Sequence, residues 1–177
     1  MDGYLDTCDG LNSYQSKEKR LEILKDSNSG AFAIIGGLSF MVLSVGFCSE
    51  INLDILKLVC LSYPLSRALS ALAVMCFPQA REKGLSSTFS KGADKLIVKL
   101  TMIVYIIAVF LILSVISLSG FIIISFVSLL MYLYHYYNCM HNFGGITGDL
   151  AGFFLEIYEL VAVIALVTAH LFNGGYV

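Results

Sequence analysis

Three aspartates lie close together within residues 1–10 of the chain. Asp2, Asp6 and Asp9 are spaced at i, i+4 and i+7, which on a helix places their carboxylates on one face. Like charges held so close repel one another, and a hard divalent cation such as Mg²⁺ relieves that repulsion because it prefers carboxylate and phosphate oxygens. The run therefore predicts a metal site. From the spacing alone, a solvated acidic segment is the alternative.

Acidic residues also interrupt the apolar C-terminal half of the chain. The acids that follow Asp94 are Asp149, Glu156 and Glu159. Their spacing of i, i+7 and i+10 allows all of them to share one face of a helix. Because an acid within a membrane span is costly, it is a functional candidate by default. Two alternatives stay open: Asp149 caps the start of its helix, and the two glutamates pair with Arg67.

Arginine and lysine residues supply candidate phosphate ligands. Arg67 follows Ser66 inside an apolar segment, and its planar guanidinium suits phosphate as well as a structural ion pair. Arg81 and Lys83 lie in a predicted loop over residues 77–86. They indicate either phosphate binding or a positively charged loop that keeps this side of the protein in the cytoplasm.

A glycine-rich loop over residues 143–149 precedes the last apolar segment. Backbone N–H groups at such a turn, just before a helix, can cradle an anion. Thr147 in this loop is a candidate substrate-binding residue, and it could equally cap the helix.

The composition places these residues in a membrane protein. Hydrophobic residues make up 58% of the 177 residues and charged residues 14%, against about 25% charged residues in soluble domains. Residues 100–148 contain no Asp, Glu, Lys or Arg. This stretch is long enough for two membrane spans of roughly 20 residues each.

We predict an all-α, polytopic membrane helical bundle of about five transmembrane helices plus an amphipathic N-terminal surface helix. The predicted spans cover residues 30–48, 55–77, 96–118, 121–137 and 150–172. Pro64 predicts a kink or a break in the second span. The charged surface helix is predicted over residues 11–29. The chain thus divides into a cytoplasmic segment, 1–29, and a single transmembrane domain, 30–177.

The basic residues predict the orientation in the membrane. Four Lys or Arg lie within residues 17–25 and five within residues 81–99, whereas the connections after the first and third spans contain none. The positive-inside rule places both basic segments in the cytoplasm, and counting spans places the loop over residues 137–149 there too. The acidic run and both loops then share one face, as a cytoplasmic active site in the cell inner membrane requires.

Five short motifs follow one another along the chain. They are D-G-Y-L-D-T-C-D-G from Asp2, L-E-I-L-K-D-S from Leu21 with Gly30 after it, S-R at Ser66, A-R-E-K-G-L from Ala80, and G-G-I-T-G-D from Gly144 with Gly152, Glu156 and Glu159 after it. In this order they resemble D-G-x-x-D-T-x-D-G, L-E-I-M-[RK]-D-S-x-x-G, S-R, Y-A-R-x-x-G-L-G and G-G-x-T-G-D-x-x-G-x-x-x-E of the cobalamin synthases, the adenosylcobinamide-GDP ribazoletransferases. The resemblance spans residues 2–159.

The resemblance implies a membrane transferase that performs the last step of cobalamin biosynthesis. It implies adenosylcobinamide-GDP and α-ribazole (or its 5′-phosphate) as substrates, GMP as the leaving group and Mg²⁺ as the cofactor. The implied metal ligands are Asp2, Asp6 and Asp9. The implied substrate-binding residues are Arg67, Arg81, Lys83 and Thr147. Asp149 or Glu156 would be catalytic, by completing the metal site or orienting the attacking hydroxyl. The expected surroundings are a lipid bilayer, with no nucleic-acid partner, and a homo-oligomer is allowed.

The chain departs from the family pattern at two points. It starts at the methionine before the aspartate signature, whereas family members carry further membrane helices upstream, so we expect a fragment, a truncated product or a mis-assigned start codon. Ser86 stands where glycine is usual.

Two other functional classes fit less well. CDP-alcohol phosphatidyltransferases also cluster aspartates, but their signature D-G-x-x-A-R differs from Leu5-Asp6-Thr7 here. A non-enzymatic transporter subunit would spread its polar residues through the membrane depth instead of gathering them at one face.

Overall fold

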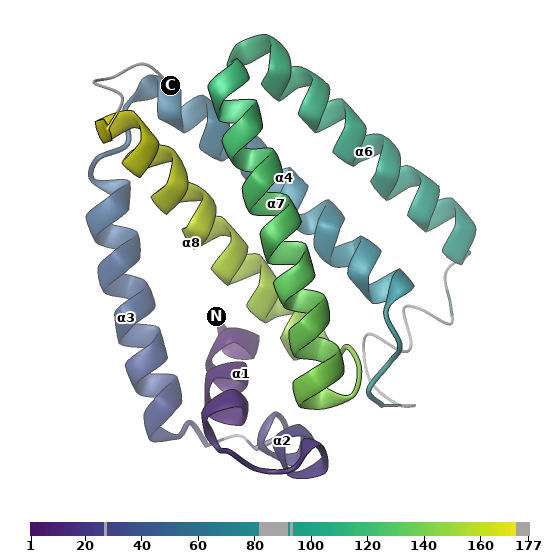
Figure 1. Ribbon diagram of the computed structural model, residues 1–177. Coiled ribbons are helices and arrows are strands. Elements are labelled where there is room, and N and C mark those ends of the chain that lie inside the picture. Colours follow the sequence, from purple (N-terminus) through teal and green to yellow (C-terminus); the bar gives the residue numbers. More distant parts are fainter. Residues whose placement is uncertain (27, 82–91, 93, 173–177) are drawn as a thin grey trace.

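The computed structural model describes residues 1–26, 28–81, 92 and 94–172. The regular elements in these ranges are α1 (Asp2–Asn12), α2 (Lys17–Ile23), α3 (Ala31–Cys48), α4 (Leu53–Cys76), α6 (Lys95–Ile116), α7 (Leu118–Asn138), the π-helical turn η1 (Cys139–Phe143) and α8 (Gly148–Phe172) (Figure 1). Among the described residues there is no strand, only an isolated bridge between Gln79 and Ile146. The predicted all-α fold is confirmed.

Five helices in the described ranges are long and apolar enough to cross a membrane: α3, α4, α6, α7 continued by η1, and α8. The chain is therefore a multi-pass membrane protein, as predicted. The predicted ends are right to within a few residues except in the fourth span, which continues as a helix to Phe143 instead of ending at residue 137. Helix α4 runs on through Pro64, so this proline does not break the second span.

The N-terminal segment contains two short helices instead of one helix over residues 11–29. Helix α1 carries the three aspartates, and α2 carries the cluster of mixed charges. Tyr14 between them has a φ of 53°, a left-handed conformation that a right-handed helix cannot contain. The predicted surface helix was therefore wrong at both ends and right only over α2.

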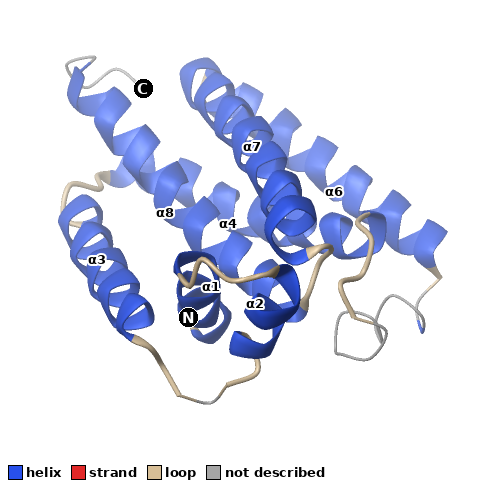
Figure 2. Cartoon of the chain, turned by 60° about the horizontal axis from the view of Figure 1, so that its bottom comes forward, coloured by secondary structure: helices blue, strands red, loops and turns tan. Residues whose placement is uncertain are grey.

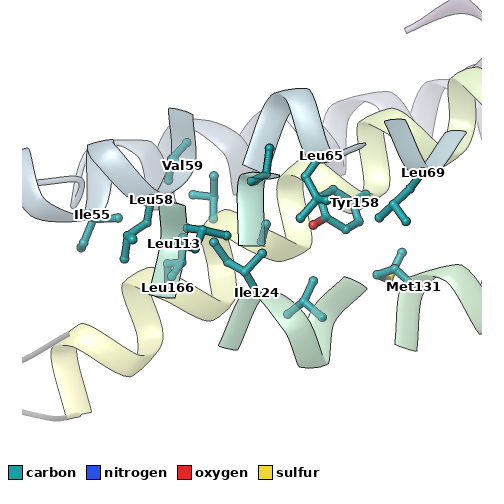
Figure 3. Packing of buried hydrophobic residues seen from close by; sticks show 14 of the residues in the cluster. Ile55, Leu58, Val59, Leu65, Leu69, Leu113, Ile124, Met131, Tyr158 and Leu166 are labelled. Atoms are coloured by element: carbon teal, nitrogen blue, oxygen red, sulfur yellow. The ribbon is translucent and has the colours of Figure 1, made fainter. Parts of the chain in front are cut away.

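The core lies where α4, α6, α7 and α8 meet (Figure 3). Leu58 of α4, Leu113 of α6 and Ile124 of α7 are completely buried there. Tyr158 of α8 is also buried, and its hydroxyl lies 2.8 Å from that of Ser128 on α7. Helix association in a bilayer depends on such packing and interhelical hydrogen bonds, since lipid is as apolar as the side chains.

Helix α3 lies to one side of this core. It connects to α4 at one end of the bundle and diverges from α8 toward the other end, where α1 lies between them (Figure 1). Most of its side chains are exposed, as expected for a helix that faces lipid. Figure 2 shows α1 and α2 at the same end as the connection between α7 and α8. The acidic run and the loop before α8 therefore lie at one end of the bundle, as predicted, whereas most of the predicted basic loop lies outside the described residues.

Candidate active site

Helix α1 packs against the start of α8 through glycine. A Cβ at Gly3 would lie 2.6 Å from the backbone oxygen of Asp149 and 2.9 Å from its Cα, so a side chain there would force backbone atoms apart. Gly152, one turn further along α8, faces Gly3 across the same contact. These small residues allow the first two turns of α1, with Asp2 and Asp6, to approach the first turn of α8.

Helix α1 is also held by α3. Tyr4 of α1 packs between Phe40 of α3 and Phe153 of α8, with ring centroids 5.2 and 5.5 Å away. A Cβ at Gly36 of α3 would lie 2.8 Å from Sγ of Cys8. The positions of the aspartates on α1 are therefore set by contacts with two helices that are far apart in the sequence.

Asp6 lies among other negative charges. Its pKa is raised from 3.8 to about 6, first by partial burial and then by Asp2, Asp149 and Asp9. In the described part of the chain, no cationic side chain pairs with Asp2, Asp6 or Asp149. The structure thus gathers uncompensated carboxylates at one end of the bundle.

The carboxylate of Asp9 is directed toward the start of α3. The amide of Gly30 donates to Oδ2 of Asp9 at 2.6 Å, and the amide of Ala33 donates to Oδ1 at 2.8 Å. An acid that caps free amides at a helix start stabilises the helix by about 0.5–2 kcal/mol. Asp9 therefore couples α1 to α3, and its role as a metal ligand stays a prediction.

Backbone hydrogen bonds join the glycine-rich loop to the residues after α4. The amide of Ile146 donates to the oxygen of Pro78 at 2.8 Å, and the amide of Ala80 donates to the oxygen of Ile146 at 3.0 Å. Gly145 has a φ of +158°, and a Cβ there would lie 2.5 Å from the nitrogen of Ala80. Glycine is therefore required at position 145 for the two segments to meet.

Thr147 and Asp149 lie at the start of α8. Thr147 is buried, and its hydroxyl accepts the amide of Leu150 at 3.2 Å. Thr147 therefore has the capping role that was its alternative. Substrate binding by Thr147 stays a prediction. Asp149 lies in the first turn, where the helix dipole favours a negative charge. The structure brings Asp149 next to the aspartates of α1.

Basic residues tie α2 to the same end of the bundle. Arg81 donates to the backbone oxygen of Leu21. Arg20 donates to Oδ1 of Asn142 at 2.6 Å. Within the described part of the chain, no contact joins Arg81 to the aspartates. Lys83, the other predicted phosphate ligand of this loop, lies outside the described residues.

Arg67 and Glu159 form an ion pair within the membrane-spanning helices. Nη1 of Arg67 donates to Oε1 of Glu159, which also accepts the hydroxyl of Ser66 at 2.7 Å. The same Nη1 donates to the backbone oxygen of Tyr63 at 3.1 Å. For Glu159 the structural alternative is thus confirmed, whereas phosphate binding by Arg67 stays a prediction.

Replacing Arg67 with methionine is expected to destabilise the folded protein. The change leaves the carboxylate of Glu159 without its cation inside a span, which costs about 1–3 kcal/mol. Unfolding by SDS in mixed micelles should show this loss, and the double variant Arg67→Met/Glu159→Gln should recover most of it. Unchanged stability of Arg67→Met would mean that the pair does not hold α4 to α8.

Lys57→Met is the matched control for that experiment. Lys57 pairs with Asp54 at 2.9 Å near the start of α4, and both side chains are largely exposed. Exposed ion pairs contribute at most about 1 kcal/mol. Its loss should therefore change the free energy of unfolding much less than Arg67→Met does.

Glu156 lies between the aspartates and the interior of the bundle. Its Oε1 accepts the N-terminal ammonium group of Met1 at 2.7 Å. Glu156 and Glu159 line a cavity of 220 Å³ between α3, α4 and α8. The other lining residues are Phe40, Ser44, Cys48, Tyr63, Leu160 and Val163. The cavity thus begins close to the end of the bundle where the aspartates gather.

Comparison with known protein families shows the family to which this chain belongs. The family model described as cobalamin-5-phosphate synthase matches residues 1–167. The chain belongs to the cobalamin-5-phosphate synthase family. The matched range includes α1 to α7 and most of α8, and with them every residue of the site described above. No solved structure matches the chain.

Curated relatives of this cobalamin-5-phosphate synthase family member agree. A Lachnoclostridium phytofermentans protein is 42% identical over 173 residues, which cover 96% of the chain and 65% of the relative. Proteins of Clostridium botulinum (strain Alaska E43) and Clostridioides difficile (strain 630) are 33% and 30% identical over 172 and 178 residues, each covering 93% of the chain and 66% of the relative. All three are named adenosylcobinamide-GDP ribazoletransferase. The chain spans slightly less than two thirds of their length.

The donor chemistry of the site in this family member fits a magnesium ion. Asp2, Asp6 and Asp149 offer hard oxygens. The pKa of Asp6 is raised first by partial burial and then by neighbouring carboxylates, whose repulsion a cation would relieve. Among the described residues, no three of His, Cys, Asp or Glu are close enough to surround one ion. Mg²⁺ commonly takes one or two carboxylates and completes its shell with water and substrate phosphates. The arrangement therefore suits an ion that binds together with a phosphate.

Some residues that position the site of this synthase-family chain were not among those predicted from the sequence. Gly36 and Gly37 allow α3 to approach α1, because a Cβ at Gly37 would lie 2.9 Å from Cδ2 of Leu5. Small residues in a span are enriched where helices pack closely, so these glycines were a signal that could have predicted the contact. The aromatic walls of the cavity, Phe40 and Tyr63, carried no signal because aromatic residues are common in membrane spans.

Proposed function

We propose that this chain catalyses the transfer that joins adenosylcobinamide-GDP to α-ribazole, or to its 5′-phosphate, with release of GMP. A ribose hydroxyl of the nucleoside would form a bond to the phosphorus next to the cobinamide. The bond from that phosphorus to the oxygen of GMP would break, and the hydroxyl proton would be lost to a base. The product would be adenosylcobalamin or its phosphate. The names of the relatives support these substrates.

The observation that carries the proposal is the cluster of Asp2, Asp6 and Asp149, which has no cationic partner among the described residues. One or two of these carboxylates would hold Mg²⁺, and water and substrate phosphates would complete its coordination. When bound there, Mg²⁺ would neutralise charge on the pyrophosphate and on the leaving GMP. Asp9 would support the site by fixing the start of α3 beside α1.

Other residues would bind and orient the substrates. Arg81 and Lys83 would pair with phosphate oxygens, and Asp149 or Glu156 would orient the attacking hydroxyl. Arg67 would act mainly by holding Glu159 in place. We place this end of the bundle at the cytoplasmic face of the inner membrane, because the basic residues gather there.

Turnover in liposomes tests the proposal. The chain, supplied with adenosylcobinamide-GDP, α-ribazole and Mg²⁺, is expected to release GMP and form a cobalamin product in equal amounts, and EDTA should stop both. The full-length Lachnoclostridium phytofermentans relative is the positive control, and CDP-diacylglycerol is the control substrate that should release no CMP. If the relative is active and this chain, inserted correctly, is not, the proposal for this chain fails.

A further inference from the structure

The cavity between α3, α4 and α8 has both apolar and polar side chains in its walls. Phe40 and Tyr63 contribute aromatic rings, and Leu160 and Val163 contribute aliphatic side chains. Its volume of 220 Å³ is below the roughly 300–1,000 Å³ of sites that hold a whole drug-sized ligand. The cavity therefore suits one aromatic ring system better than an entire large substrate.

Polar groups of the cavity have free hydrogen-bonding capacity. The hydroxyl of Ser44 makes no hydrogen bond within the described part of the chain, although it can both donate and accept. Oε1 of Glu156 and Oε1 of Glu159 have partners, whereas neither Oε2 accepts a hydrogen bond from a described residue. An apolar cleft with a few unused polar groups is the usual form of a small-molecule site.

The cavity adjoins the aspartates through Glu156. Met1, which bonds Glu156 at 2.7 Å, directly precedes Asp2. Along α8, seven residues separate Asp149 from Glu156, which is about 10 Å of helix. A nucleoside whose base enters the cavity would therefore place its sugar beside Glu156, between the cavity and the carboxylates that gather at the end of the bundle.

We propose that this cavity binds the aromatic base of the nucleoside co-substrate. The base packs between Phe40 and Tyr63, Ser44 donates to its ring nitrogen, and Glu156 accepts a ribose hydroxyl. A bicyclic base such as benzimidazole fits this chemistry, because its faces are apolar and it has one ring nitrogen that accepts a hydrogen bond. The inference rests on the proposed function and deepens it, since it assigns the choice of nucleoside to residues of α3, α4 and α8.

Filling the cavity tests this assignment. In equilibrium dialysis with the whole chain in detergent, Ser44→Phe is expected to raise the Kd for α-ribazole at least tenfold, whereas the Kd for adenosylcobinamide-GDP stays unchanged. In turnover assays, only the KM for α-ribazole should rise. Ser44→Ala, which removes the donor without filling the space, should raise the same constants by about 2- to 10-fold. This smaller change keeps the test valid if the phenylalanine variant does not fold.

Val45→Phe is the matched control, because the side chain of Val45 is 70% exposed on the outer side of the same helix. Equal α-ribazole binding by Ser44→Phe and Val45→Phe, with turnover intact, would overturn the assignment and leave the proposed function standing. A bound lipid that native mass spectrometry detects in the parent and not in Ser44→Phe, with unchanged α-ribazole binding, would assign the cavity to an acyl chain instead. An unmodified chain that neither binds α-ribazole nor turns over would remove both proposals.

Discussion

Replacing Asp6 with asparagine is expected to lower the rate of transfer by on the order of 10³-fold. Asparagine keeps the size of the side chain but removes the charge that the proposed Mg²⁺ site needs. The measurement is kcat for GMP release at saturating Mg²⁺. Glu18→Gln, which removes an exposed acid of α2, is the matched control and should leave kcat unchanged. Parent-like turnover by Asp6→Asn would contradict the metal site.

Thermal unfolding gives the Asp6 variant a second readout that does not depend on activity. Because the pKa of Asp6 is raised from 3.8 to about 6 in the folded protein, the metal-free parent should lose stability as the pH rises from 3.8 through 6, since Asp6 must then ionise while partly buried and beside like charges. Metal-free Asp6→Asn should therefore have a higher Tm than the parent at pH 7.5, and the difference should vanish below pH 3.8. Mg²⁺ should raise the Tm of the parent only.

Adding a single methyl group at Gly3 is expected to lower kcat/KM by roughly 10²-fold. The Cβ of Gly3→Ala would lie 2.6 Å from the backbone oxygen of Asp149, so α1 and α8 must separate. A shift of about 1 Å between groups that act on one substrate has an effect of this size. The measurement is kcat/KM for GMP release, with circular dichroism to confirm that the helices persist.

Gly46→Ala is the matched control for the change at Gly3. No atom lies within 4 Å of a Cβ built at Gly46, and alanine favours a helix over glycine by about 1 kcal/mol. Its activity should match the parent, and its stability should stay equal or rise. If Gly3→Ala also matches the parent, the contact between α1 and α8 does not set the geometry of the site.

The membrane helices could be predicted because few structures satisfy a long apolar segment in a bilayer. The continuation of the fourth span as η1 could not, since Asn142 and the glycines that follow it are typical of a loop. The structure keeps Asn142 helical because its Nδ2 donates to Oδ1 of the buried Asn138 at 2.5 Å. The turn at Tyr14 was also missed, because tyrosine is an uncommon residue at a positive φ.

The sequence predicts which residues belong to the candidate site, but not which partner each acidic side chain contacts. The spacing of the aspartates places them on one face of α1, yet it does not reveal that Asp9 meets the free amides of Gly30 and Ala33. Likewise, Glu156 and Glu159 lie one turn apart on α8 and have different partners. Which partner each acid meets depends on how helices distant in sequence rotate against one another, and periodicity within one helix carries no such information.

The contact between Gly3 and Asp149 also has a consequence for biosynthesis. Helix α1 precedes the five described spans in the sequence and is translated before them, whereas α8, the helix on which it docks, follows the other four of these spans. During synthesis, the acidic face of α1 therefore has no α8 to pack against until α8 has been inserted into the membrane. The carboxylate cluster can form only then, so a nascent chain that stalls before α8 would display the aspartate motif without a site.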